Sequence, residues 1–226
     1  VEECRNDEKP YWYSYLGRDV KAEDVDWQEF LGDRPKRPFN AEMYSAWYGH
    51  YEFCQGPIPQ WGAHFLDMAH FITGCSLPAS CVCTGGIFTW KDEHRFTTPD
   101  CIQATWIYPE GFLLTSSNNL GNGFGNSRKF FGDKGVLKVD NWNAPTYSAQ
   151  GGPRRDGSIR GEIAVPPVER PDHFLDWLQC VRSGNTPHAS IDAGYQHAVA
   201  CLMATRSYET GRRTVYNAAK RRIDLS

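Results

Sequence analysis

The chain has 226 residues and a net charge of −3 at pH 7, with 40% hydrophobic and 23% charged residues. These values fit a folded protein with a sizeable core. They exclude a general nucleic-acid binder, because no broad basic face is available to neutralise phosphates. No apolar run approaches the roughly 20 residues that cross a bilayer, so we expect no membrane segment.

The eight cysteines show no CxxC pair and no Cys/His spacing typical of a zinc site. Dispersed cysteines within apolar patterns favour free thiols in a reducing compartment, so we expect a cytoplasmic protein. The chain lacks an initiator Met, from which we expect that its natural N-terminus is missing. Export of the full-length protein therefore stays open.

The first third of the chain predicts short elements rich in aromatic side chains. Residues 11–15 alternate enough for a short strand or an extended arm. One short helix can be capped by Asp24 or Asp26, and a second by Asn40. Between the two helices, the prolines of segment 33–39 predict an ordered loop.

A longer amphipathic helix is predicted from Trp61 to Thr73, ending at Gly74. His64 and Asp67 lie one turn apart on it, so their side chains could act together. The alternative is a structural histidine that Asp67 holds in place. The predicted buried stripe consists of Trp61, Phe65, Met68 and Ile72.

After this helix the pattern changes to consecutive strands joined by short turns, which predicts an antiparallel meander. The predicted strands are 80–90, with a bulge at its two glycines, 101–108, 112–118, 127–131 and 135–140. A surface excursion over 141–170 follows, with one strand near 161–165. The last predicted elements are helices over 174–182 and from 190 or 192 to 208, and a strand over 214–216.

A glycine-rich segment at 121–126 superficially resembles a cofactor-binding loop. Its spacing is GxGxG, it lies between two predicted strands, and no helix follows to place its N-terminus on a pyrophosphate. We expect a hairpin loop here. The chain also lacks P-loop, GxSxG and HExxH motifs, so the sequence predicts no self-sufficient dinucleotide site and no metal site.

Several blocks follow one another along the chain: DVDW, FLG and PKRPF within 24–39, WGAHFLD at 61–67, TTPD at 97–100, FGDKG at 131–135, and HFLDWL with RSG and Pro within 173–187. In this order they resemble the Gfo/Idh/MocA oxidoreductase family. The resemblance spans almost the whole chain and concerns the C-terminal half of the family's sugar-processing branch.

The resemblance implies an α+β fold with an open, mainly antiparallel sheet and helices packed on one face. It implies one substrate-binding and oligomerisation domain over residues 1–226, which forms a homo-oligomer through the sheet. NAD or NADP would be held by an N-terminal Rossmann domain that this chain does not contain. The cleft between the two domains would bind a sugar or polyol.

The family's catalytic histidine matches His64. A histidine can take the alcohol proton during hydride transfer because its pKa lies near neutral pH. Family members usually carry an acid four positions earlier, but this chain has Gln60, which can orient a hydroxyl and cannot titrate. Asp67 is then the expected orienter of His64.

Four further residues are candidate sugar contacts, each with a structural alternative in the core or in a loop: Trp61, His94, Arg95 and Asp100. A local positive group could meet cofactor phosphate from a partner domain, or could be a solvated loop. It consists of Arg34, Lys36 and Arg37.

The sequence thus favours the substrate domain of an NAD(P)-dependent sugar or polyol oxidoreductase that is not redox-active alone. Two alternatives remain open. One is a stand-alone carbohydrate-binding or assembly module. The other is a nicotinamide-independent lyase or isomerase that uses His64 as its base.

Overall fold

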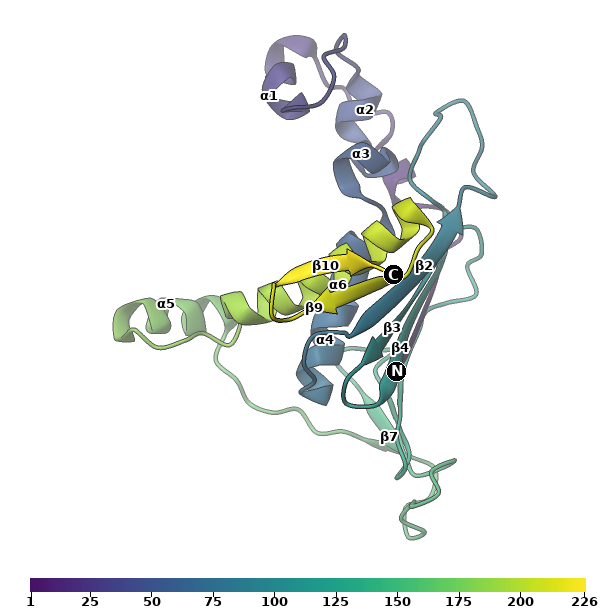
Figure 1. Ribbon diagram of the computed structural model, residues 1–226, viewed down its shortest axis with the longest axis vertical. Coiled ribbons are helices and arrows are strands. Elements are labelled where there is room, and N and C mark those ends of the chain that lie inside the picture. The colour runs from purple at the N-terminus through teal and green to yellow at the C-terminus, as the bar shows by residue number, and fades with distance from the viewer.

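The central strands alternate between buried and exposed side chains, as a sheet with one covered face requires. In the computed structural model, which describes residues 1–226, strand β3 (Cys101–Tyr108) buries Ala104 and Trp106 and exposes Gln103 and Ile107. The covered face lies against two helices, α4 (Ala63–Thr73) and α6 (Ile191–Thr210), as Figure 1 shows.

Ten strands form one open sheet in the order β10-β9-β2-β3-β4-β1-β5-β6-β7-β8. Every neighbouring pair is antiparallel except β1 with β4. This confirms the predicted fold class of a mainly antiparallel open sheet with helices. The remaining strands are β1 (Glu2–Asn6), β2 (Ser80–Gly86), β4 (Phe112–Asn119), β5 (Ser127–Phe131), β6 (Val136–Lys138), β7 (Thr146–Ser148), β8 (Glu162–Ala164), β9 (Thr214–Asn217) and β10 (Arg222–Leu225).

The position of β1 corrects the predicted meander. This strand lies between β4 and β5, parallel to the first and antiparallel to the second. Glu3 is paired with Ser116 on one side and with Arg128 on the other. The glycine-rich segment 121–126 therefore crosses over β1 and is not a hairpin loop. Short turns predict which strands follow each other, but they do not exclude a strand inserted from elsewhere in the chain.

Helical backbone before His64 begins earlier than the predicted Trp61, although α4 itself begins at Ala63. A π-helical turn, η4 (Ile58–Gly62), leads directly into α4, and Gly74 ends α4 in the left-handed region at φ 63°. The predicted buried stripe is wrong at two of its four positions, because Trp61 and Ile72 are 44% and 38% exposed. The face that packs against α6 and the sheet consists of Phe65, Leu66, Ala69 and His70.

Two further local predictions differ from the structure. Residues 11–15 form a 3₁₀ turn, η1 (Tyr11–Tyr15), that begins directly after Pro10, and not a strand or extended arm. Strand β2 stops at Gly86 and has no bulge, since its register with β3 is regular to the end. Gly85 is needed for close strand approach, because a Cβ atom there would lie 2.4 Å from the Cys101 carbonyl oxygen.

The helix caps follow the sequence closely. Asp26 accepts from the Glu29 amide, and Asn40 accepts from the Met43 amide. Strands β7 and β10 were not predicted, whereas β8 and β9 confirm the strands expected near 161–165 and 214–216. The other helices are α1 (Trp27–Leu31), α2 (Ala41–Ser45), α3 (Tyr51–Cys54) and α5 (His173–Ser183), which is capped by Asp172.

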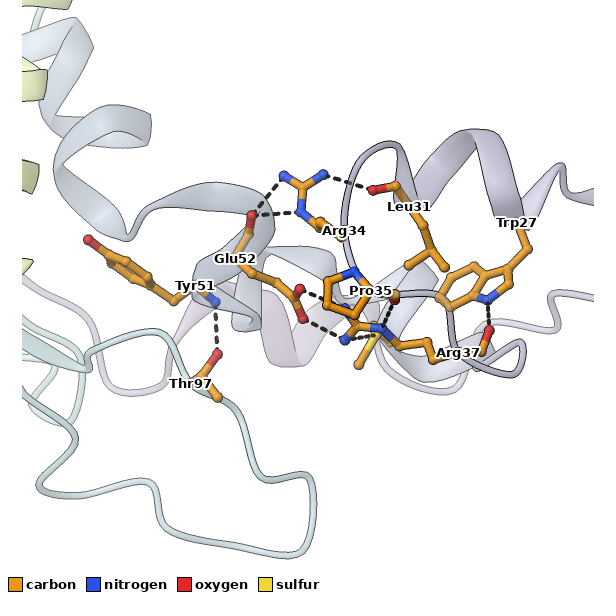
Figure 2. Close-up of polar contacts among 9 residues, drawn as sticks. Trp27, Leu31, Arg34, Pro35, Arg37, Tyr51, Glu52 and Thr97 are labelled. Carbon is orange, nitrogen blue, oxygen red and sulfur yellow. Dashed lines mark hydrogen bonds and ion pairs between the residues drawn. The ribbon is translucent and has the colours of Figure 1, made fainter.

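Two arginines of the proline-rich segment 33–39 bind Glu52 of α3. Figure 2 shows the Arg37 guanidinium on the Glu52 carboxylate, with two nitrogen–oxygen distances of 2.7 Å. Arg34 donates to the carbonyl oxygens of Glu52 and Leu31. Arg37 holds the pKa of the Glu52 carboxyl below its ordinary value. Both arginines therefore fix α3 to the loop after α1, which agrees with the loop alternative for this segment.

The main core lies between the sheet and helices α4 and α6. Trp106 is fully buried there, and its indole nitrogen donates to the Ala200 carbonyl at 2.9 Å. All eight cysteines are free thiols, and burial raises the pKa of Cys201 to about 12. None of the helices is long and apolar enough to cross a membrane.

Candidate functional site

His64 lies in the first turn of α4, and its exposed ring borders three neighbouring hollows. The ring forms no hydrogen bond within the chain and lies 6.1 Å from the indole of Trp61, measured between centroids. The preceding π-helical turn carries Gln60 and Trp61 on the same side. Such turns often occur at functional sites. His64 is thus an unoccupied donor or acceptor where three ligand-sized spaces meet.

The first space, the aromatic hollow, measures about 390 Å³ and is lined mainly by aromatic rings. Tyr11 donates its hydroxyl to the Gln60 side-chain oxygen, which fixes the amide in place. Burial raises the pKa of the Tyr11 hydroxyl, so this group stays a protonated donor. The hollow is lined by Tyr11, Tyr15, Trp47, Tyr48, Gln60, Trp61 and His64.

The second space, the arginine hollow, measures about 260 Å³ and has charged walls. Glu3 and Arg5 enter it from β1, and Arg128 enters it from β5. The Arg128 Nε atom lies 3.5 Å from a Glu3 carboxylate oxygen. Trp61, Trp142 and His64 complete the lining.

The third space, the histidine hollow, measures about 630 Å³ and is lined by five of the seven histidines. Asp67 lies here, but its carboxylate is 3.4 Å from His197 Nδ1 and forms no hydrogen bond with His64. The predicted pairing of Asp67 with His64 is therefore wrong. A spacing of one helical turn allows contact between Asp67 and His64, but α6 places His197 closer to the Asp67 carboxylate. No group of His, Cys, Asp and Glu side chains is arranged to hold a metal ion.

His70 also borders this hollow, although its side chain is largely buried. Its Nε2 atom is 2.6 Å from the Tyr108 hydroxyl, while its Nδ1 atom is buried without a partner. Burial, reinforced by the nearby His197, lowers the pKa of His70 to about 4. The ring is therefore neutral at physiological pH.

Three predicted sugar contacts lie outside all three hollows. His94 Nδ1 is 3.0 Å from the Glu42 carboxylate, and its ring stacks on Phe96. Arg95 is exposed at a turn with φ 52°. Asp100 is 2% exposed, and both of its carboxylate oxygens accept backbone N–H groups. The structure thus assigns a loop-fixing role to Asp100 and leaves His94 and Arg95 apart from His64.

Of the seven predicted site residues, four lie at the hollows: Gln60, Trp61, His64 and Asp67. Sequence reasoning missed the charged residues Glu3, Arg5 and Arg128, because β1 was not recognised as a central strand. It also missed the partners of Trp61 in the aromatic hollow. The high aromatic content hinted at such a surface, but it could not show which rings meet.

No protein-family model matches the sequence, and no curated protein matches it either. The fold, by contrast, is that of the C-terminal domain of Gfo/Idh/MocA-type oxidoreductases. The chain spans about half the length of the solved structures that it matches, with 54% and 55% of two of those chains covered.

Three solved structures illustrate the likeness. A candidate oxidoreductase from Thermotoga maritima is 18% identical with a TM-score of 0.63, over 95% of this chain and 54% of its own. Aldose-aldose oxidoreductase from Caulobacter crescentus, complexed with glycerol, is 16% identical with a TM-score of 0.58, over 95% and 55%. The WlbA dehydrogenase from Bordetella pertussis, complexed with NADH and UDP-GlcNAcA, is 14% identical with a TM-score of 0.57, over 94% and 54%.

Replacement of Asp100 tests its loop-fixing role. Asp100→Asn keeps one acceptor oxygen but turns an amide group toward the donors that Oδ2 now satisfies. We expect the free energy of unfolding to fall by about 3 kcal/mol, since hydrogen bonds to a charged acceptor contribute about 1.5–3 kcal/mol each. Urea denaturation measures the change. Asp133→Asn, at an exposed ion pair, should cost less than about 1 kcal/mol. Unchanged stability of Asp100→Asn would contradict the assignment.

The buried His70 predicts a specific loss of stability in acid. Its folded-state pKa of about 4 lies below the ordinary 6.5. Its contribution is therefore complete above pH 6.5 and is lost as the pH falls from 6.5 toward 4. Between pH 7 and pH 4.5 the wild type should lose about 2–3 kcal/mol more than His70→Gln, which cannot titrate. Parallel urea titrations at both pH values measure this difference, and equal losses would exclude His70 as the titrating group.

Proposed function

We propose that the chain is the substrate-binding domain of an NAD(P)-dependent sugar or polyol oxidoreductase. The observation that carries the proposal is the position of His64, whose free imidazole borders three ligand-sized hollows at the start of α4. The fold of the C-terminal oxidoreductase domain supports it. Two solved structures with this fold were obtained with glycerol and with a nucleotide sugar, which are polyhydroxy ligands.

His64 is suited to exchange a proton with a substrate hydroxyl. Its ring is exposed and has no partner within the chain, so both nitrogens can reach a ligand. An imidazole can take the proton of an alcohol while that alcohol is oxidised, and return it in the reverse direction. Gln60, held by Tyr11, can orient the same hydroxyl from the preceding turn. Asp67 takes no part in this arrangement, since it faces His197.

Residues 1–226 do not build a nicotinamide dinucleotide site of the Rossmann kind. The glycines at 121, 123 and 125 are exposed between β4 and β5, and a strand follows them, so no helix N-terminus faces the loop. The sheet also has no repeated parallel βαβ units. In the proposed enzyme, a separate domain would hold NAD or NADP, which accepts the hydride. The residues described above would bind the substrate and move its proton.

A stand-alone carbohydrate-binding module is a second candidate, and the aromatic hollow favours it. The rings of Tyr11, Tyr48 and Trp61 surround this hollow without help from any other domain. Aromatic faces provide large apolar contact area beside polar edges, which suits a sugar ring. A carbohydrate-binding module needs no proton transfer at His64. The two functions therefore predict different effects when the His64 imidazole is removed.

The open face of the sheet supports the proposal of a homo-oligomer. Ile107 and Leu113 are cross-strand neighbours on this face and are 39% and 52% exposed. Val82 and Val215, on β2 and β9, are 41% and 37% exposed. Burying these side chains against a second copy would remove apolar surface from water.

The kinetic effect of removing the His64 imidazole separates the two functions. In the complete enzyme, His64→Ala should lower kcat by about 10²–10⁴-fold, the usual contribution of a general base. Asp67→Asn is the matched control on the same helix and should retain at least about a third of kcat, because an exposed ion pair contributes little. Steady-state kinetics with NAD or NADP and a panel of sugars and polyols measures both.

Two results would overturn the oxidoreductase proposal. One is an undiminished kcat for His64→Ala. The other is micromolar binding of NAD to the isolated chain, measured by calorimetry, because residues 1–226 would then hold the cofactor themselves. Sugar binding without any redox turnover of the complete protein would select the carbohydrate-binding module.

The proposed sheet interface can be tested by a single charge. Leu113→Glu should dissociate the oligomer at micromolar protein concentration, because it would bury a carboxylate between two sheets. Leu175→Glu on α5 introduces the same change at a site that is 45% exposed and lies away from the sheet, so it should leave the oligomer intact. Light scattering after size-exclusion chromatography measures both masses. A monomeric wild type would refute the interface.

A further inference from the structure

The arginine hollow contains a buried cationic donor that the chain itself does not satisfy. Arg5 and Arg128 both line it; Arg5 is paired with Asp7, whereas Arg128 has only the carboxylate of Glu3 at 3.5 Å. The side chains of the two arginines are only 12% and 11% exposed. The Arg128 Nε atom is buried and has no hydrogen-bond partner. Buried donors without partners are rare in folded proteins, so these groups point to an acceptor that enters from outside.

Glu3 compensates this charge only in part. One of its carboxylate oxygens accepts the Ser116 hydroxyl at 2.8 Å, and the other is 3.5 Å from Arg128 Nε, beyond good hydrogen-bond distance. Burial raises the pKa of Glu3 above its ordinary value. Arg5 donates through Nε to Asp7 at 2.7 Å and forms no other side-chain hydrogen bond. The Arg128 guanidinium and the remaining N–H groups of Arg5 are therefore available to an anionic acceptor.

Two tryptophans, Trp61 and Trp142, belong to the lining of the hollow. The Arg5 guanidinium carbon lies 4.1 Å from the Trp61 ring centroid, and that of Arg128 lies 5.2 Å from the Trp142 ring centroid. The two indoles are 44% and 50% exposed, so part of each remains accessible to a ligand. His64 lies in the same lining. A ligand with both a carbohydrate-sized apolar face and an anionic group would use all of these residues.

We propose that the arginine hollow binds the carboxylate of an acidic monosaccharide, with Arg128 and Arg5 as its cationic contacts. A planar guanidinium matches a carboxylate through two parallel N–H···O bonds, and an ammonium group cannot do this. The ring then lies between Trp61 and Trp142 and presents a hydroxyl to His64. This inference rests on the proposed function and narrows its substrate class to sugar acids.

Calorimetric titration of the purified chain with glucuronate and with glucose tests the inference, because the two sugars differ only in the carboxylate. Glucuronate should bind at least about tenfold more tightly, as expected for a charged hydrogen-bonded pair. Arg128→Gln should reduce the affinity for glucuronate to that for glucose. Lys129→Gln is the matched control: it removes the same charge from the adjacent residue of β5, outside the lining, and should change neither affinity.

A second variant acts in the opposite direction and keeps the test decisive if Arg128→Gln does not fold. Glu3→Gln removes the competing carboxylate with almost no change of shape and should tighten glucuronate binding about threefold or more. A merely structural role of Glu3 would weaken binding or leave it unchanged. Circular dichroism of each variant establishes that it is folded.

Several outcomes would overturn the inference. Equal affinities for glucose and glucuronate, with kcat lowered in His64→Ala as expected above, would refute the acidic substrate class and leave the proposed oxidoreductase standing. Inorganic phosphate that binds as tightly as glucuronate would show an anion site without sugar recognition. An absence of binding by either sugar would refute the assignment of this hollow.

Discussion

The pairing of β1 between β4 and β5 is the constraint on which the site depends. Five residues of backbone, Glu2–Asn6, complete the centre of the sheet. This pairing places the side chains of Glu3 and Arg5 beside Arg128, and the following turn, η1, brings Tyr11 to Gln60 directly before α4. Without β1 the arginine hollow would lose two of its three charged residues, and Tyr11 would not reach Gln60.

Helix α4 carries two histidines, one buried and one exposed. His64 and His70 lie on the same helix, six residues apart. His70 faces the sheet, and its low pKa keeps it neutral against Tyr108. His64 points away from the core toward the three hollows. The buried side chain cannot titrate near pH 7, and the exposed His64 contributes little to packing.

The charged side chains divide in a similar way. Arg37 and Glu52 satisfy each other within the chain (Figure 2). Asp100 is likewise satisfied by three backbone amides, and both sets of contacts fix loops. Arg128 is the exception, because it is buried with an unsatisfied donor. A charge that is locally satisfied has little left to offer a ligand. This difference, and not the number of charges, separates binding candidates from scaffold residues.

The sequence alone determined the features that depend on neighbouring residues. Helix caps such as Asn40, the stop at Gly74 and the alternation along β3 follow from local hydrogen bonds and from side-chain periodicity. The resemblance to known enzymes then selected His64. Only the tertiary structure decided the partner of Asp67 and the place of β1.

The same division explains why the hollows around His64 could not be predicted in full. Asp67 could pair with the nearer residue in the sequence, yet α6 brings His197 closer in space. The arginine hollow joins residues from β1, η4 and β5, and β1 and β5 lie more than 120 residues apart. Local propensity fixes which elements form, whereas contacts between distant segments depend on how the whole sheet is ordered. The place of His64 on a helix was therefore predictable, and its surroundings were not.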